Sequence, residues 1–300
     1  MTILITGANG LLGQYLVRHL LQQNYNVIAT GKGPDRLCPK HAHYTYHDMD
    51  ICDATMVHTI IGNTRPDVLV HAAAMTQVDD CELNPALCER VNVTGTANVL
   101  TAAEATGAHV IYVSTDFVFD GEKGNYAEED DLNPVNYYGF TKMQAEAMVQ
   151  TSDIPWSIVR TCLVYGNVLK GTRQNIITWV RDNLSRGKTI KVVCDQWRTP
   201  TYVEDLATGI GLIAARQAQG IYHLSGKDLL TPYDMAMETA AYLKLDSTLI
   251  TRVDAATFTQ PGRRPPKTGF QIDKARHELG YEPITFREGL MKVAGNGTSL

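Results

Sequence analysis

The chain begins with the stretch Ile3-Leu4-Ile5-Thr6-Gly7-Ala8-Asn9-Gly10-Leu11-Leu12-Gly13, and this stretch decides the fold. A short apolar run is followed by a glycine-rich turn and then by a helix-like segment through about Gln23. Glycine permits positive φ and close backbone approach, so amide groups and a helix dipole can face a pyrophosphate. The spacing Gly7, Gly10, Gly13 differs from the G-x-G-x-x-G of ordinary dinucleotide folds. The stretch predicts a dinucleotide-binding turn, and a tight turn without a ligand is the alternative.

Beyond this turn, short β-branched runs alternate with longer helical patterns, which indicates an α/β fold with a doubly wound parallel sheet. The predicted strands are Asn26–Thr30, Tyr44–His47, Val68–His71, His109–Val113 and Trp156–Arg160, with a later one at Ile190–Val193. The predicted helices are Asp53–Ile61, Pro85–Thr106, Val135–Gln150, Arg173–Arg186, Val203–Arg216 and Pro232–Leu243. We expect a Rossmann-type domain over residues 1–165, to which a segment near 190–215 returns. Residues 166–300 are expected to form mostly a smaller α/β lobe that binds substrate over the carboxyl ends of the strands.

Composition excludes several classes of protein. The chain has 300 residues with 44% hydrophobic content, which is enough for a sizeable core. A net charge of −5 provides no basic patch for nucleic acid. No stretch is apolar enough to span a membrane, and the first residues contain no signal sequence, so we expect a cytoplasmic protein. The six cysteines lack metal-ligand spacing, and no metal site is expected.

Tyr138 and Lys142 form the second informative pattern. An (i, i+4) spacing places both side chains on one helix face. A nearby ammonium can favour the phenolate and make tyrosine a proton donor near neutral pH. A solvated surface pair is the alternative for such a motif in isolation, but the amino-terminal turn favours the catalytic interpretation.

Several further motifs occur in order along nearly the whole chain. They are Thr6–Gly13, Asp67–Thr76, Ser114–Gly121, Asn133-Pro134 through Tyr138-Gly139 to Lys142, Asp195-Gln196, Thr199–Thr201, Glu204–Ala207 and Arg263-Arg264-Pro265. With these motifs the chain resembles the extended short-chain dehydrogenase/reductase superfamily, and within it the dTDP-4-dehydrorhamnose reductase family. The resemblance implies reduction of the 4-keto group of a dTDP-deoxysugar, in the synthesis of dTDP-rhamnose.

The resemblance also assigns catalytic roles. Tyr138 would donate a proton to the carbonyl oxygen, and Lys142 would lower the tyrosine pKa and hold the nicotinamide ribose. Thr115 would provide the hydroxyl that also binds the carbonyl oxygen, and Ser114 is the alternative for this role. Because side chains alternate along a strand, Ser114 and Thr115 should face opposite sides, so that only one of them can serve.

The cofactor is expected to be NADPH, with NADH as the alternative. The end of the second strand carries no acidic residue, whereas Lys32 and Arg36 lie close by and could bind a 2′-phosphate. In the other interpretation, Lys32 and Arg36 are solvated loop cations and Asp35 binds the ribose. The expected cofactor contacts are Gly7, Asn9, Gly10, Leu11, Leu12, Gly13, Lys32, Asp50, Ile51, Ala72, Ala73, Ala74, Tyr138 and Lys142.

For the nucleotide-sugar substrate, the resemblance implies contacts from Thr76, Asp116, Leu163, Arg198 and Arg264. Arginines suit bidentate binding of a diphosphate. Two positions depart from the family pattern. Leu163 stands where the family has a tryptophan that contacts the sugar, and Gln14 or Tyr15 stands where some members have a glutamate for magnesium. Sugar identity and magnesium dependence are therefore open.

Two other functions remain under consideration. The chain also resembles the regulatory subunit of methionine adenosyltransferase, which binds NADP but serves mainly as a partner-binding module. This resemblance rests on the segments Leu163–Gly166, Thr199–Thr201 and Tyr222–Gly226. An NDP-sugar epimerase, with tightly held NAD, is the third interpretation. A homodimer is an open alternative to a monomer.

Overall fold

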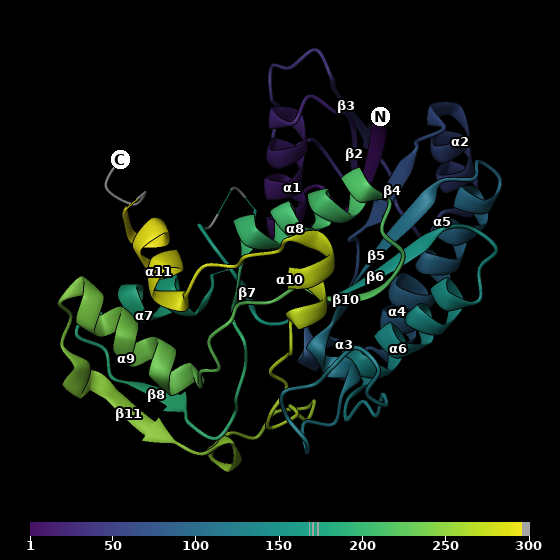
Figure 1. Cartoon of the computed structure of the whole chain (residues 1–300). Coiled ribbons are helices and arrows are strands. Elements are labelled where there is room, and N and C mark those ends of the chain that lie inside the picture. Colours follow the sequence, from purple (N-terminus) through teal and green to yellow (C-terminus); the bar gives the residue numbers. More distant parts are fainter. Residues whose placement is uncertain (168, 170, 173, 296–300) are drawn as a thin grey trace.

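The amino-terminal strand lies near the middle of a seven-stranded sheet. The computed structural model describes residues 1–167, 169, 171–172 and 174–295. The strand order is β10-β6-β5-β4-β1-β2-β3, and every neighbouring pair is parallel. The strands are β1 (Thr2–Thr6), β2 (Asn26–Gly31), β3 (Tyr44–Asp48), β4 (Val68–His71), β5 (His109–Thr115), β6 (Trp156–Thr161) and β10 (Gly220–His223). This arrangement confirms the predicted doubly wound α/β fold (Figure 1).

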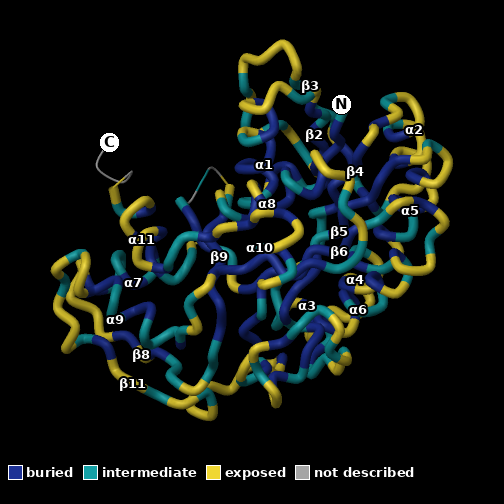
Figure 2. Tube along the Cα trace, viewed as in Figure 1, coloured by how far each residue is buried: buried dark blue, intermediate teal, exposed yellow. Residues whose placement is uncertain are grey.

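Helices cover both faces of this sheet, and side-chain alternation explains why. Ile3 and Ile5 enter one buried cluster, whereas Leu4 enters another, because successive strand residues point to opposite faces. The first cluster includes residues of α1 (Leu11–Gln22), α8 (Val203–Arg216) and α10 (Asp273–Leu279). The second includes residues of α2 (Ala54–Thr64), α5 (Gly95–Glu104) and α6 (Tyr137–Gln150). The buried trace follows the sheet between these layers (Figure 2).

The glycine-rich turn between β1 and α1 brings backbone segments into close contact. Gly7 has φ of +73°, a conformation that glycine adopts at little cost. A Cβ on Gly13 would lie 2.4 Å from the Gly7 carbonyl oxygen and 2.5 Å from the Ala8 Cα. A Cβ on Gly7 would lie 2.8 Å from the Ala73 backbone nitrogen. The glycines therefore let α1 begin directly against β1 and against the chain that leaves β4.

One predicted helix contains a π-turn. The segment expected as a helix over Pro85–Thr106 consists of α4 (Pro85–Glu89), a π-helical turn η1 (Arg90–Thr94) and α5. Within this turn the Asn92 side chain bonds the backbone of Met75, with 2.8 Å from the Met75 nitrogen to Asn92 Oδ1. A π-turn adds a residue to the helical turn, a feature that is often found at functional sites.

A smaller group of elements follows the sheet strand β6. It contains α7 (Ile176–Leu184), β8 (Ile190–Val193), α9 (Pro232–Leu243), β11 (Ile250–Val253) and α11 (Phe286–Gly295). Strands β8 and β11 pair in parallel beside α7 and α9, and Figure 1 shows this group set apart from the main sheet. The predicted start of α7, Arg173, lies outside the described residues.

Two of the later elements return to the large sheet. Helix α8 packs on α1, and β10 adds to the sheet next to β6. Strands β7 (Val164–Tyr165) and β9 (Thr201–Tyr202) pair with each other. The remaining helical elements are α3 (Val78–Leu83), η2 (Asp116–Val118), η3 (Ser247–Leu249) and η4 (Ala255–Thr257). The division of the chain at residue 165 stays a prediction.

Two features are absent from the described ranges of the chain. No helix within them has the combined length and apolar character that a bilayer span needs. No group of three or more metal-ligating His, Cys, Asp or Glu side chains occurs in the same ranges.

We expect Gly13→Ala to destabilise the protein by about 1–3 kcal/mol, because its Cβ meets only backbone atoms that cannot move aside. The matched control is Gly62→Ala, in helix α2, where a Cβ meets nothing within 4 Å. That change should stabilise by about 0.5–1 kcal/mol, because alanine favours the helix. Urea unfolding of both variants measures the difference, and equal midpoints would contradict the proposed role of Gly13.

Candidate functional site

The amino terminus of α1 is open to a ligand. Gly10 is its N-cap residue, and no side chain of the described residues caps it. The first amide groups of a helix have no partner within the helix. Here those amides belong to Leu11, Leu12 and Gly13. Because the first turn carries no acidic residue, the positive end of the helix dipole can attract an anion. This geometry fits the pyrophosphate of a dinucleotide.

Asn9, in the same turn, is engaged with the loop after β2. Its Nδ2 donates to the Pro34 carbonyl oxygen at 3.1 Å, and its Oδ1 accepts from the Arg36 backbone nitrogen at 3.1 Å. The Tyr46 hydroxyl also lies 2.9 Å from Asn9 Nδ2. The side chain thus positions the loop that carries Lys32, while the backbone of Asn9 remains part of the turn.

The structure brings two predicted cofactor residues into direct contact. Lys32 Nζ lies 2.8 Å from Asp50 Oδ2, and this pair is open to solvent on the lysine side. Asp50 raises the pKa of the exposed Lys32 through their hydrogen bond. Ile51 is buried, and it faces Gly95 at the start of α5. An exposed cation at the end of β2 is available to a phosphate that can compete with Asp50.

At the end of β4, the backbone of Ala72–Ala74 passes beside the glycine-rich turn. The Ala73 nitrogen donates to Thr6 Oγ1 at 3.2 Å. The same Thr6 hydroxyl lies 2.7 Å from His71 Nδ1, and His71 Nε2 lies 3.0 Å from Thr96 Oγ1. Burial lowers the pKa of His71 to about 3, so this imidazole stays neutral. It joins β1, β4 and α5 behind the alanine segment.

The predicted proton donor and its hydroxyl partner lie together. Tyr138, in the first turn of α6, is buried, and the Thr115 side chain at the end of β5 lies close enough to act on its hydroxyl. Burial raises the pKa of Tyr138, and the Thr115 side chain opposes that rise. Asn136 caps α6 by accepting from the Gly139 nitrogen at 2.8 Å. Gly139 allows the helix to pass close to the Phe117 carbonyl oxygen.

The two candidate hydroxyls face opposite ways, as strand alternation requires. Ser114 Oγ donates to Glu146 Oε1 at 2.5 Å, on the side of the sheet covered by α6. Thr115 Oγ1 instead contacts Tyr138 and donates to Asp116 Oδ1 at 3.1 Å. Only Thr115 is therefore placed to share a carbonyl oxygen with Tyr138.

Lys142 lies one turn after Tyr138 on the same helix and is buried. Its Nζ donates to the Val113 carbonyl oxygen at 2.8 Å and lies 4.0 Å from the centre of the Tyr112 ring. Burial lowers the pKa of this ammonium to about 7, while the charge of Glu146 opposes the change. A lysine that titrates near neutrality lies within one helical turn of the tyrosine.

The sequence analysis missed Asn92. In addition to Met75, its amide contacts Thr141, with 3.0 Å from Nδ2 to Thr141 Oγ1. It therefore connects the loop after β4 with helix α6, from within the π-turn. The available signal is a polar amide inside an otherwise helical run.

Two predicted substrate residues, Asp116 and Arg198, form a buried pair. Arg198 Nε lies 3.7 Å from Asp116 Oδ2, and both side chains are about 5% exposed. Arg198 also donates to the Pro265 carbonyl oxygen at 2.7 Å and to the Trp197 carbonyl oxygen at 2.8 Å. Burial raises the pKa of Asp116, against the opposing charge of Arg198. This pair holds two loops to the end of β5.

Arg264, another predicted substrate residue, is held by α3. It makes a bidentate contact with Asp79, with distances of 2.5 Å and 2.7 Å. Thr76 is exposed in the loop after β4. Leu163 is 41% exposed and has φ of +40°, which is uncommon for a branched side chain. A diphosphate would compete with Asp79 for Arg264, whereas Leu163 offers only apolar contact.

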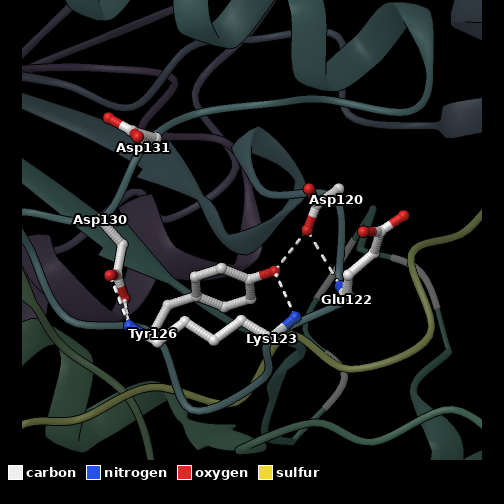
Figure 3. A pocket seen from close by; sticks show the side chains of 6 residues that line it. All are labelled: Asp120, Glu122, Lys123, Tyr126, Asp130 and Asp131. Carbon is white, nitrogen blue, oxygen red and sulfur yellow. Dashed lines mark hydrogen bonds and ion pairs between the residues drawn. The ribbon is translucent and has the colours of Figure 1, made fainter.

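A separate hollow of about 400 Å³ lies within the loop after η2 (Figure 3). Its lining residues are Asp120, Glu122, Lys123, Tyr126, Asp130 and Asp131. Several of them pair with one another: Lys123 Nζ contacts Asp130, and the Tyr126 hydroxyl donates a hydrogen bond to Asp120. Four carboxylates against one ammonium would repel a phosphate. This hollow does not suit a nucleotide.

Together, the sheet, the glycine-rich turn and the Thr115, Tyr138 and Lys142 set define an extended short-chain dehydrogenase/reductase. The family model described as RmlD substrate binding domain matches residues 1–298, and the chain belongs to this family. A dTDP-4-dehydrorhamnose reductase structure from Clostridium acetobutylicum has a TM-score of 0.88 and 30% identity, with 99% of both chains covered.

Two other relatives differ in their described roles. A Bacillus anthracis dTDP-4-dehydrorhamnose reductase in complex with NADP has a TM-score of 0.86 and 28% identity, over 98% of this chain and 99% of that one. Methionine adenosyltransferase 2 subunit beta from Bos taurus is 33% identical over 296 residues, which is 96% of this chain and 85% of the relative. The predicted family resemblance is confirmed, and the family supports an oxidoreductase in general terms. The NADP complex agrees with the predicted nicotinamide cofactor.

The buried neutral His71 should make stability depend on pH. Its pKa is about 3 in the folded chain and about 6.5 when unfolded, so its contribution is present above pH 6.5 and is lost as pH falls towards 3. Replacing it in His71→Gln should reduce the slope of unfolding free energy between pH 6 and 4.5 by about 1.4 kcal/mol per pH unit. The control His58→Gln changes an exposed histidine and should keep the original slope. Urea unfolding at several pH values measures both, and an unchanged slope in His71→Gln would refute a buried neutral imidazole.

Proposed function

We propose that this protein uses NADPH to reduce the 4-keto group of a dTDP-deoxysugar, with NADH as the less favoured donor. The observation that carries the proposal is that Thr115 and Tyr138 lie together at the end of β5, with Lys142 one turn away on α6. This group lies at the carboxyl end of β5, the edge of a doubly wound sheet where ligands bind. The open amino terminus of α1 lies at the same edge, after β1.

The residues of the chain supply the acid half of the reaction. A bound nicotinamide would supply the hydride that adds to the carbonyl carbon. Tyr138 would give its phenolic proton to the carbonyl oxygen, so that the C=O double bond becomes a C–O single bond with one new C–H and one new O–H bond. Thr115 hydrogen-bonds the same oxygen and holds it against the phenol. Lys142 provides the positive charge that favours the resulting phenolate and is placed to bind the nicotinamide ribose.

The dinucleotide is proposed to lie across the turn and along β4. Its pyrophosphate would accept hydrogen bonds from the free amides of α1, from Leu11 to Gly13. Its nicotinamide ribose would lie beside Ala72–Ala74. Lys32, and with it Arg36, would favour the 2′-phosphate of NADPH. Asp50, which contacts Lys32, would lie beside the adenosine part.

The substrate is proposed to approach from the loops that Arg198 and Arg264 hold. Arg264 is the group better placed for a diphosphate, because its partner Asp79 is partly exposed and can be displaced. Arg198 is buried and engaged with backbone oxygens, so its proposed contribution is to position Asp116 and Phe117 beside the sugar. Leu163 would offer an apolar contact to the sugar.

A second function has one observation in its favour. Methionine adenosyltransferase 2 subunit beta is 33% identical to this chain, and Leu163 replaces the sugar-contacting tryptophan that the reductase resemblance implies. An NADP-binding regulatory subunit would need the dinucleotide but no turnover. An epimerase would instead retain NAD and release no oxidised cofactor, so cofactor consumption separates the three functions.

Oxidation of NADPH with a panel of dTDP-4-keto sugars tests the proposal directly. Tyr138→Phe should lower turnover by about 10²-fold or more, because the proton donor is lost, while NADP affinity changes little. The neighbouring tyrosine provides the control: Tyr137→Phe removes a hydroxyl that contacts Glu89 and should keep full activity. No turnover with any sugar, together with tight NADP binding, would reject the reductase in favour of the regulatory subunit.

Lys32→Gln should lower the preference for NADPH over NADH by about 10-fold or more, because a charge-assisted contact with the 2′-phosphate is lost. Lys40→Gln, an exposed lysine in the same connection between β2 and β3, is the matched control and should keep the preference. Comparison of kcat/KM for the two dinucleotides measures the effect. An unchanged ratio in Lys32→Gln would place the 2′-phosphate elsewhere.

A further inference from the structure

Helix α6 carries a buried acid that the proposed reaction does not use. Glu146 follows Tyr138 and Lys142 at intervals of four residues, so the three side chains share one face of the helix. Its side chain is 0% exposed. A buried carboxylate is costly unless it is paired and hydrogen-bonded, so its partners need an explanation.

Those partners come from two strands of the sheet. Arg160, on β6, makes a bidentate contact with Glu146, with 3.1 Å from Nε to Oε1 and 2.8 Å from NH2 to Oε2. Ser114, on β5, donates to Oε1 at 2.5 Å. Arg160 is itself 2% exposed and donates to the Glu128 carbonyl oxygen at 3.0 Å. The carboxylate therefore fastens α6 to β5 and β6 at one point.

Strand β5 also holds Lys142. Its Nζ contacts the carbonyl oxygen of Val113, and Val113 is followed directly by Ser114, which contacts Glu146. The ammonium and the carboxylate thus meet consecutive residues of β5 from consecutive turns of α6. Any movement of the carboxylate would shift the turn that carries the lysine.

Glu146 also acts on the buried lysine through its charge, which raises the pKa of Lys142. The titratable groups that act on Lys142 or border it are Tyr138 and Glu146 on α6, Cys88 on α4, Tyr112 on β5 and His71 on β4. His71 is neutral near pH 7, and burial raises the pKa of Tyr112 and of Tyr138. The thiolate form of Cys88 is the other group that favours the ammonium.

We propose that Glu146 is a positioning residue for the reductase site: anchored by Arg160 and Ser114, it holds Lys142 against β5 and keeps the ammonium charged. Arg160 and Ser114 serve the site through Glu146. This assigns to Ser114 a role different from that of the Thr115 hydroxyl. The kinetic consequence rests on the proposed function, whereas the charge on Lys142 can be measured without any substrate.

The first test is an NMR titration of protein labelled with [13Cε]lysine, in which Lys142→Arg identifies the Lys142 signal. The wild-type midpoint is expected at about pH 7. Loss of the carboxylate in Glu146→Gln/Arg160→Gln should lower that midpoint, because Glu146 favours the ammonium and burial opposes it, while the simultaneous loss of the Arg160 charge keeps the shift smaller than loss of the carboxylate alone would give. Changing both partners avoids leaving a buried guanidinium without its acid.

The matched control is Ser157→Ala. Ser157 is a buried serine on β6 that contacts His109 and the Ala218 carbonyl oxygen but not Glu146, and its loss should leave the Lys142 midpoint unchanged. Glu146→Asp keeps the charge but shortens the side chain, and it should lower the midpoint by a smaller amount. If the double variant does not fold, the Lys142 midpoint of Glu146→Asp is compared with that of Ser157→Ala instead. A midpoint equal to that of Ser157→Ala in every folded Glu146 variant would overturn the proposal.

The second test is kinetic. If Tyr138 works with a charged Lys142, the alkaline limb of the kcat profile should move to lower pH in the Glu146 variants by the same amount as the NMR midpoint, with KM for the sugar little changed. A lower midpoint without any reductase activity in the wild-type chain would reject the proposed function but leave the charge role of Glu146 intact. A midpoint and a pH profile that both stay fixed would reject the positioning role itself.

Discussion

The contact between Gly13 and the Gly7 carbonyl oxygen is the constraint on which the rest of this structure depends. Because neither residue carries a Cβ, helix α1 starts directly against the end of β1. The free amides of the helix are thereby placed at the carboxyl edge of the sheet, beside the backbone of Ala73. A larger residue at either position would push α1 away from this edge. The dinucleotide site that we propose requires this close approach, since the pyrophosphate must reach backbone groups rather than side chains.

The reactive side chains depend on a second point of attachment. Helix α6 brings Tyr138 to Thr115 at its first turn, and two turns later Glu146 joins it to β5 and β6 through Ser114 and Arg160. Between these two points lies Lys142, buried in a position that lowers its pKa to about 7. A helix attached only at Tyr138 could rotate and withdraw the ammonium. Two attachments separated by eight residues define both its position and its orientation.

The approach to the site depends on loops that come from distant parts of the chain. Asp116 and Arg198 form a buried pair that joins the end of β5 to the segments around Trp197 and Pro265. Asp79 holds Arg264 in a similar way from α3. Relatives with the same fold include both reductases and a subunit of another enzyme. Differences of function between such relatives come from the residues of the site, because the sheet and its turn are common to the whole fold.

The sequence by itself determined the sheet, the glycine-rich turn and the Tyr138 and Lys142 spacing. These features are local, since alternation along a strand, glycine conformation and helical spacing each depend on a few neighbouring residues. The Thr115 and Ser114 alternatives were also limited by alternation, but tertiary contacts with Tyr138 and Glu146 were needed to separate them. The predicted helix over Pro85–Thr106 contains a π-turn, in which Asn92 bonds Met75 and Thr141, and local helical periodicity does not reveal such contacts. Only the tertiary structure decided the partners of Arg198, Arg264 and Glu146, because a charged side chain does not reveal in sequence which distant backbone or acid will satisfy it.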